Sequence, residues 1–396
     1  MKRAFKILTV VLAVLMASLL ASPAIAADTE TDKSALYAPL QKGIGYVAIG
    51  DSFTRGYGAG DVWQDHIYLN DTYGNFECRN VPGSYPNLVA EKFGLAAPED
   101  IRDMSGKLWP LAHDAVSTAY VLDLLGIDDG FRDEEFTYAY SYMTERYETD
   151  LRYFGDPLSY ALDGQSTYGQ TGEIMSVRDM IKNASLITIG VGQTDVIYKA
   201  QIFGLNVLDF NDTASLPAGV AHIIELLDKY FHYWENAYPL LIDYVRKVNP
   251  DAKIVLVGTL NPLKDATLND EIEIKIGSIL NGIMDRVNQY TQRCALQYGC
   301  LYVDISDVDT PTSVNPKSIG QIMSITDSIE YALIAHPTPH GYEQIADRII
   351  DVVEKDLQKD AARQVAKSFL YRFIEWFKSL MAKIAGLLDG ISGKLS

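Results

Sequence analysis

Short apolar runs alternate along this chain with longer segments whose apolar residues lie three or four positions apart. The short runs predict buried strands, and the longer segments predict amphipathic helices. The predicted strands are 46–50, 101–104, 186–190, 253–258 and 301–304. The predicted helices are 85–93, 111–125, 173–182, 218–248, 272–295 and 341–357. This alternation predicts one α/β domain over residues 43–356, with a parallel sheet covered by helices on both faces.

Two segments interrupt this alternation, at about 61–80 and 131–168. Both are rich in aromatic residues, and we expect both to be insertions near the site. Their aromatic side chains either line a substrate groove or pack within ordinary loops. The sequence leaves both interpretations open.

The amino-terminal segment has the pattern of a secretory signal. Basic residues precede an apolar run over 7–20, and small residues lead up to Ala26. This pattern predicts a signal peptide over 1–26 and a secreted protein, because the apolar run is too short for a comfortable membrane span. Residues 27–42 then form a polar leader into the first strand.

The carboxyl-terminal segment 357–396 differs in charge from the domain before it. It holds seven basic and three acidic residues, whereas 27–356 holds 24 basic and 49 acidic residues, a net charge of −25. Its apolar residues recur at helical spacing, so we predict a basic amphipathic helix. Such a helix is typical of peripheral membrane association, here through 360–394. The alternative is that it docks on the domain or on a partner helix.

The acidic balance of the whole chain, a net charge of −18, argues against nucleic acid as a partner. The sequence contains no Cys-x-x-Cys and no His-Glu-x-x-His pattern, so we expect no metal and no cofactor. Cys294 and Cys300 lie close enough in sequence to form a small-loop disulfide in an oxidising compartment, which leaves Cys78 over.

Ser52 follows the predicted strand 46–50 directly, in a segment that contains several glycines. A serine at the end of a buried strand is raised above the sheet, with backbone N–H groups of the next turn beside its hydroxyl. This is the placement that a nucleophilic serine needs. The other interpretation is a glycine-rich turn in which Ser52 caps a short helix.

A nucleophilic serine requires a base, and the chain offers few histidines. His222 and His232 fall within a predicted helix and are expected to be surface or core residues. His336 lies in a loop before the last predicted helix that prolines make rigid. A rigid loop holds a base in the fixed position that proton transfer requires. The six histidines are His66, His113, His222, His232, His336 and His340.

Four short blocks occur in order: Gly-Asp-Ser52, Gly106 after a predicted strand, Gly192-Gln-Thr-Asp195 after the next, and His336-Pro before the last helix. Together they resemble the blocks of the SGNH (GDSL-type) ester hydrolase family. The resemblance covers about residues 43–356. It implies a flavodoxin-like three-layer α/β/α fold, with Ser52 as nucleophile and His336 as base.

The resemblance also implies an oxyanion hole made by the N–H groups of Ser52 and Gly106 and by an asparagine side chain. Here Thr194 stands at the asparagine position. The family usually carries an aspartate three residues before the histidine, and here that position is Leu333. We expect either a backbone carbonyl or a nearby acid such as Asp327 to orient His336.

These residues predict a secreted serine ester hydrolase of the lipase or esterase type, acting on a small-molecule, lipid or glycan ester. Two alternatives stay open. One is a carbohydrate acetylesterase, and the other is a catalytically weakened protein that binds a glycan or lipid. The presence of both Ser52 and His336 favours an enzyme.

Overall fold

A computed structural model describes residues 33–59, 81–97, 106–112, 117–125, 127, 177–198, 216–267, 277–318, 321–322 and 333–395. The chain divides into the units Met1–Ala35 and Leu36–Ser396. Of the first unit only residues 33–35 are described. The predicted signal peptide, both predicted insertions, Cys78 and Asp327 lie outside the described residues.

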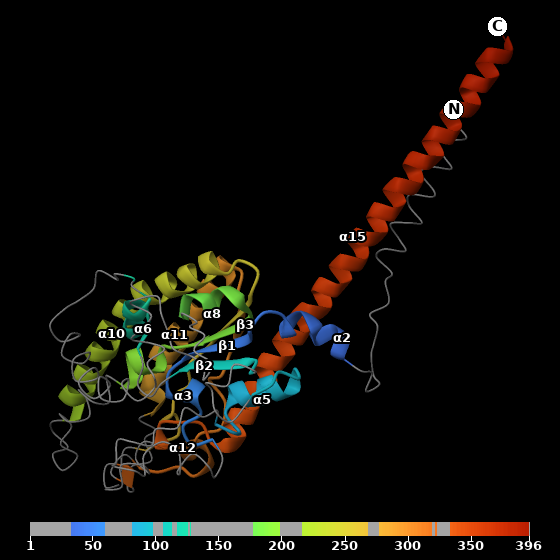
Figure 1. The fold of residues 1–396 in the computed structure, drawn as a ribbon. Helices are drawn as coiled ribbons and strands as arrows, with labels where there is room; N and C mark the ends of the chain where they lie inside the picture. The colour runs from blue at the N-terminus through green and yellow to red at the C-terminus, as the bar shows by residue number, and fades with distance from the viewer. Residues whose placement is uncertain are drawn as a thin grey trace. The chain divides into compact units, whose positions relative to one another are not determined.

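The centre of the second unit is a five-stranded sheet in which every neighbouring pair is parallel. In spatial order its strands are β2 (Leu108–Ala112), β1 (Gly45–Gly50), β3 (Ala184–Gly190), β4 (Lys253–Val257) and β5 (Leu301–Val303) (Figure 1). This is the flavodoxin-like strand order. It confirms the predicted α/β fold with a parallel sheet.

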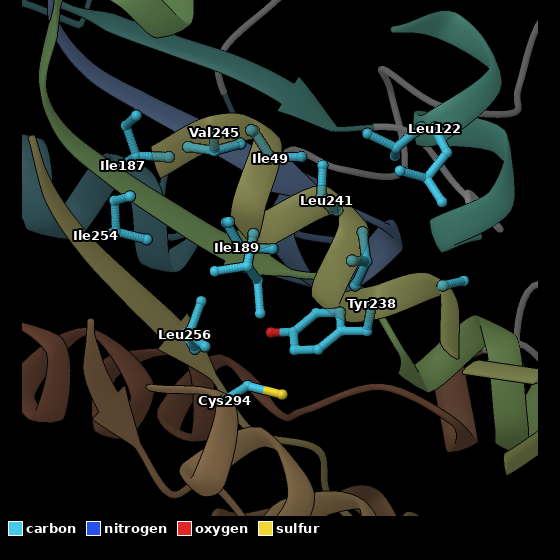
Figure 2. Close-up of a cluster of buried hydrophobic side chains, with 14 of the residues drawn as sticks. Ile49, Leu122, Ile187, Ile189, Tyr238, Leu241, Val245, Ile254, Leu256 and Cys294 are labelled. Atoms are coloured by element: carbon cyan, nitrogen blue, oxygen red, sulfur yellow. The ribbon is translucent and has the colours of Figure 1, made fainter. Parts of the chain in front are cut away.

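Successive side chains of a strand point to opposite faces of the sheet, and this periodicity divides the core into two layers. Val47 and Ile49 belong to one buried cluster, whereas Tyr46 and Ala48 belong to the other. The first cluster is covered by α6 (Thr118–Leu124), α8 (Val177–Asn183), α10 (Leu216–Val248) and α11 (Gly277–Tyr298). Figure 2 shows its side chains from β1, β3 and β4 gathered around Tyr238, Leu241 and Val245 of α10.

The second face is covered by α5 (Tyr85–Lys92) and by the first part of α15 (Pro339–Leu395). The residues that α15 buries there recur every three or four positions, as expected for one face of a helix. They are Tyr342, Ile345, Ala346, Ile349, Val353 and Leu357. Shorter helical segments complete the described unit: α2 (Ser34–Tyr37), η1 (Ala38–Gln41), α3 (Ser52–Arg55), η3 (Thr194–Tyr198) and α12 (Pro311–Val314).

The second strand differs from the sequence prediction. The predicted strand 101–104 lies outside the described residues, and β2 occupies 108–112, so the predicted helix 111–125 was wrong at its start. Pro110 lies inside β2, although proline cannot donate a ladder hydrogen bond. It is tolerated because β2 is an edge strand that pairs only with β1.

The expected disulfide is absent from this part of the molecule, because Cys294 and Cys300 are both free thiols. Cys294 is buried beneath the sheet (Figure 2), and burial raises the pKa of its thiol to about 11. Cys300 instead lies beside the Arg246 guanidinium, whose Nη2 is 3.6 Å from its Sγ. Burial also raises the pKa of the half-buried Cys300 thiol, and protonated thiols are poor nucleophiles.

Candidate active site

Ser52 lies at the turn between β1 and α3, at the carboxyl edge of the sheet. Asp51 caps α3, and its Oδ1 accepts a hydrogen bond from Phe53 N at 3.1 Å. The turn is tight enough to require glycine at the strand end, since a Cβ on Gly50 would lie 1.8 Å from Thr54 Oγ1. The predicted strand–turn–serine arrangement is therefore what the chain adopts at this point.

His336 is held in the loop that leads into α15. Its backbone N–H donates to Leu333 O at 3.1 Å. Two residues later, Thr338 N donates to Asp309 O at 2.9 Å, and Thr338 Oγ1 accepts from Gly341 N at 3.0 Å. These bonds fix the loop on both sides of His336.

Aromatic rings from the serine turn enclose the imidazole. The Tyr57 ring stacks on it with centroids 4.4 Å apart, and the Phe53 ring meets it edge-on at 5.0 Å. The Tyr57 carbonyl in turn accepts a hydrogen bond from Tyr342 OH on α15 at 2.7 Å. As a result His336 is only 8% exposed and its ring is held in one plane.

The decisive contact of the site joins these two segments. His336 Nε2 lies 2.7 Å from Ser52 Oγ, although the residues are 284 positions apart in sequence. This is the distance at which an imidazole can take the proton of a serine hydroxyl as it attacks. His340, the other histidine of the loop, is 65% exposed and pairs with Glu343 at 2.9 Å instead.

Gly106 does not lie beside Ser52, which corrects the sequence prediction. Because the second strand follows Gly106 instead of preceding it, this glycine stands at the amino edge of the sheet, where the neighbouring Lys107 O accepts from Tyr46 N. Ser52 stands beyond the opposite, carboxyl edge, where Gly50 pairs with Ala112; Gly106 precedes Ala112 by six residues, or about 20 Å at 3.3 Å per residue. The residues that follow β2 at the serine edge are 113–116, which lie outside the described part of the chain.

Thr194 is buried at the carboxyl end of β3, but its hydroxyl is directed at a carboxylate. Thr194 Oγ1 lies 3.2 Å from Asp51 Oδ2 and its backbone N 3.4 Å from the same oxygen. Its neighbour Gln193 is bonded to the segment after β4, with Nε2 donating to Leu260 O at 3.1 Å. The expected role of Thr194 as an oxyanion donor therefore stays a prediction. It requires the Thr194 hydroxyl to turn its hydrogen away from Asp51 and toward the substrate oxygen.

Two buried aspartates, Asp51 and Asp195, accept hydrogen bonds from neighbouring segments of the site, and the sequence did not predict this role. Asp51 holds Thr194, and Asp195 accepts hydrogen bonds from both Thr118 N and Thr118 Oγ1 at 2.9 Å. The second pair ties the turn after β3 to the start of α6, just beyond 113–116. The available signal was an aspartate immediately after an apolar strand, since such a carboxylate needs donors from neighbouring loops once it is buried.

Burial raises the pKa of Asp51 from its usual range to about 7, although the donors of Phe53 and Thr194 oppose this shift. A carboxyl whose pKa is higher in the folded state binds protons more readily there than in the unfolded chain. Its contribution to stability is therefore largest below about pH 4 and is lost as the pH rises through 7.

This arrangement yields a prediction for Thr194→Val, which keeps the shape of the side chain and removes its hydroxyl. We expect the variant to lose about 1–3 kcal/mol of unfolding free energy, because a buried carboxylate loses a donor. The loss is expected to be larger at pH 8, where Asp51 is ionised, than at pH 4. Chemical denaturation at both pH values measures it.

Thr194→Ser is the matched control, since it retains the hydroxyl and should keep both stability and kcat. A Val variant that unfolds like the wild type at pH 8 would contradict the Asp51 role. If that variant instead loses about 10²–10³-fold in kcat at unchanged stability, Thr194 acts as an oxyanion donor.

The group that orients His336 is not the aspartate usual at position 333. Leu333 packs against Gly58, where an added Cβ would lie 2.7 Å from Leu333 Cδ2. Asp327 lies outside the described residues, so its expected orienting role stays a prediction. Within the ranges that the structure describes, no cluster of three His, Cys, Asp or Glu side chains could hold a metal ion.

Solved structures with a similar fold include several ester hydrolases. An extracellular lipase from Streptomyces rimosus is 17% identical, with a TM-score of 0.45 over 78% of this chain and 98% of the lipase. A phospholipase A1 from Streptomyces albidoflavus is 18% identical, with a TM-score of 0.42 over 79% and 99%. A family two carbohydrate esterase from Cellvibrio japonicus is 15% identical, with a TM-score of 0.35 over 79% and 61%.

A comparison with curated proteins gives no match. The family model of the GDSL-like lipase/acylhydrolases, in contrast, matches residues 46–349. That range is most of the chain, and it includes the serine turn, the segment after β3 and the His336 loop. This chain therefore belongs to the GDSL-like lipase/acylhydrolase family of hydrolases.

Proposed function

We propose that this protein is a serine hydrolase of carboxylic esters. The observation that carries the proposal is the 2.7 Å contact between Ser52 Oγ and His336 Nε2. Both groups lie at the carboxyl edge of a parallel sheet, which is where ligands bind in folds of this kind. A protein that only binds its ligand has no need of this pairing of a hydroxyl with an imidazole.

In the proposed reaction Ser52 Oγ attacks the ester carbonyl carbon while His336 Nε2 takes the hydroxyl proton. The tetrahedral intermediate collapses, the bond to the alcohol oxygen breaks, and His336 gives its proton to the departing alcohol. Water then enters, loses a proton to His336 and attacks the acyl-serine. Collapse of the second intermediate breaks the bond to Ser52 Oγ, which takes the proton back from His336 as the acid is released.

The negative oxygen of each intermediate needs hydrogen-bond donors that are already in place. We assign one to the Ser52 N–H, which begins α3 and follows the Asp51 cap. Gly106, at the other edge of the sheet, is excluded from this role by its position.

The experiment is turnover of p-nitrophenyl esters of increasing acyl length by the purified protein, alongside a phospholipid and an acetylated xylan. We expect hydrolysis of at least the short-chain esters, with release of p-nitrophenol. The relative kcat/KM across the panel separates a lipase from a carbohydrate acetylesterase. Binding of a lipid or glycan without any turnover would show that the protein is a weakened family member and would overturn the proposal.

We also propose that the enzyme works outside the cell after cleavage behind Ala26. The basic residues, the apolar run and the small residues before Ala27 support this. Among the helices of the described ranges, none has the length and apolarity to span a bilayer. A secreted protein whose first residue is Ala27 is the expected result, and retention of residues 1–26 would contradict it.

A further inference from the structure

The described side chains in the last part of α15 include many apolar ones that are not buried against the rest of the protein. The helix continues without interruption from Pro339 to Leu395 (Figure 1). Its last fully buried residue is Leu357, and its last link to the sheet is the ion pair of Lys253 with Asp360 at 2.6 Å. From 361 to 383 every side chain is exposed except Phe373, which is half-buried.

The exposed segment carries an apolar stripe, which we define as Val365, Phe369, Leu370, Phe373, Ile374, Trp376, Phe377, Leu380 and Met381. At about 100° per residue these positions fall on one side of the helix. Val365 is 70% exposed, Trp376 56% and Leu380 36%. The aromatic members form a cluster on the helix surface, with the Phe373 and Trp376 ring centroids 5.8 Å apart.

Cations border this stripe on both sides. By the same helical geometry, Lys367 and Lys378 fall along one border and Arg372 and Lys383 along the other. Between 363 and 383 there are five basic residues and a single acid, Glu375, which pairs with Lys378 at 2.8 Å. An apolar face containing Trp and Phe, with cations along both edges, matches the boundary between acyl chains and anionic headgroups.

We propose that residues 363–383 of α15 bind the surface of an anionic lipid bilayer, with the apolar stripe inserted and the bordering cations on the headgroups. This inference does not depend on the proposed ester hydrolysis. The helix is too polar to span the bilayer, which is consistent with an in-plane position.

Two other occupants fit the segment less well. If two copies of the helix paired through their apolar stripes, the cationic borders of the two helices would face each other. The borders along 363–383 carry no acidic residue that could compensate this repulsion. The apolar face, at nearly half the helix circumference, is also wider than the narrow seam of a two-stranded coiled coil. Folding back onto the chain's own domain would bury these side chains, whereas the structure leaves them exposed.

The acidic domain does not prevent this attachment. From Leu357 to Met381 the helix extends about 36 Å at 1.5 Å per residue. Charges further apart than about 8 Å are largely screened at physiological ionic strength. The far end of the binding segment therefore lies well beyond the screening distance from Leu357, the last buried residue of α15.

The test uses protein that begins at Ala27, so that the apolar run of 1–26 cannot itself bind lipid. Vesicles of phosphatidylglycerol and phosphatidylcholine are sedimented with the protein, and vesicles of phosphatidylcholine alone serve as the uncharged reference. We expect binding to the anionic vesicles that weakens steeply as salt is raised. Replacing Lys367, Arg372 and Lys383 with glutamine should weaken it by on the order of 100-fold, at about fivefold per cation.

The matched control replaces Lys42, Lys182 and Lys247 with glutamine. These exposed lysines lie on the domain, so the net charge changes equally while vesicle binding should not. Phe369→Ser with Leu380→Ser should also abolish binding, because the stripe loses its apolar centre. Equal loss in the domain-lysine control, or undiminished binding by both helix variants, would overturn the proposal.

A chain ending at Ala362 distinguishes the other occupants, since it keeps Leu357 and Asp360. We expect its melting temperature to stay within about 2 °C of the longer protein, because the removed residues up to 383 are exposed apart from the half-buried Phe373. A clear fall in melting temperature would show that the helix docks on the domain. Dimers of the longer protein that become monomers on truncation, without vesicle binding, would show helix pairing, and either result would end the lipid assignment.

Discussion

Ser52→Ala is expected to lower kcat for ester hydrolysis by on the order of 10⁴-fold or more while the fold is retained, as loss of a serine nucleophile does in other hydrolases. The reason is the position of Ser52 Oγ, 2.7 Å from Nε2 of the His336 imidazole. The substitution removes the attacking atom and leaves Asp51 and the cap of α3 unchanged.

The measurement is single-turnover hydrolysis of a short p-nitrophenyl ester, with circular dichroism to verify folding. Ser306→Ala is the control, because Ser306 lies after β5 and outside the site. A fluorophosphonate reagent should add its mass to the wild type and to the Ser306 variant but not to the Ser52 variant. Undiminished turnover by a folded Ser52→Ala protein would show that another group is the nucleophile.

His336→Ala is expected to cost about 10²–10⁴-fold in kcat/KM, the usual effect of losing a general base. His340→Ala should change it by less than about twofold, since the His340 ring is exposed and pairs with Glu343. The two residues lie in one loop four positions apart, so each variant is the control for the other.

A second readout separates loss of the base from disturbance of the loop. If His336 accepts the serine proton, the wild-type rate should fall as the pH drops and the imidazole becomes protonated, and this limb should vanish in the His336 variant. Fluorophosphonate labelling of Ser52 should slow in that variant as well. An inactive His340 variant beside an active His336 variant would contradict the assignment of the base.

The sequence was sufficient for the parts of this protein that repeat a simple period. Alternating faces of β1 and β3, and the spacing of Ile345, Ile349 and Val353 on α15, follow directly from strand and helix geometry. Ser52 and His336 were accessible because each stands at a marked boundary, a glycine turn in one case and a proline-stiffened loop in the other. Their contact depends on the strand order, which no local pattern contains.

The second strand shows why the remainder was not predictable. Pro110 argues against a strand unless the strand is known to lie at an edge, and edge position is a property of the assembled sheet. The sequence prediction began a helix at 111 and took Gly106 to follow a strand at 101–104, residues that the structure does not describe, whereas β2 follows Gly106. The Thr194 hydroxyl presents the same difficulty, because its partner Asp51 lies 143 residues away.

Ser52 and His336 lie 284 positions apart, so the nucleophile is synthesised well before its base. At about 5–20 residues per second, a ribosome needs roughly 15–60 seconds to add the base after it has added the nucleophile. During that interval β2, β3, β4 and β5 are synthesised in turn, yet Ser52 has no His336 imidazole beside it. The growing polypeptide is thus unable to cleave esters by this route until synthesis has passed His336.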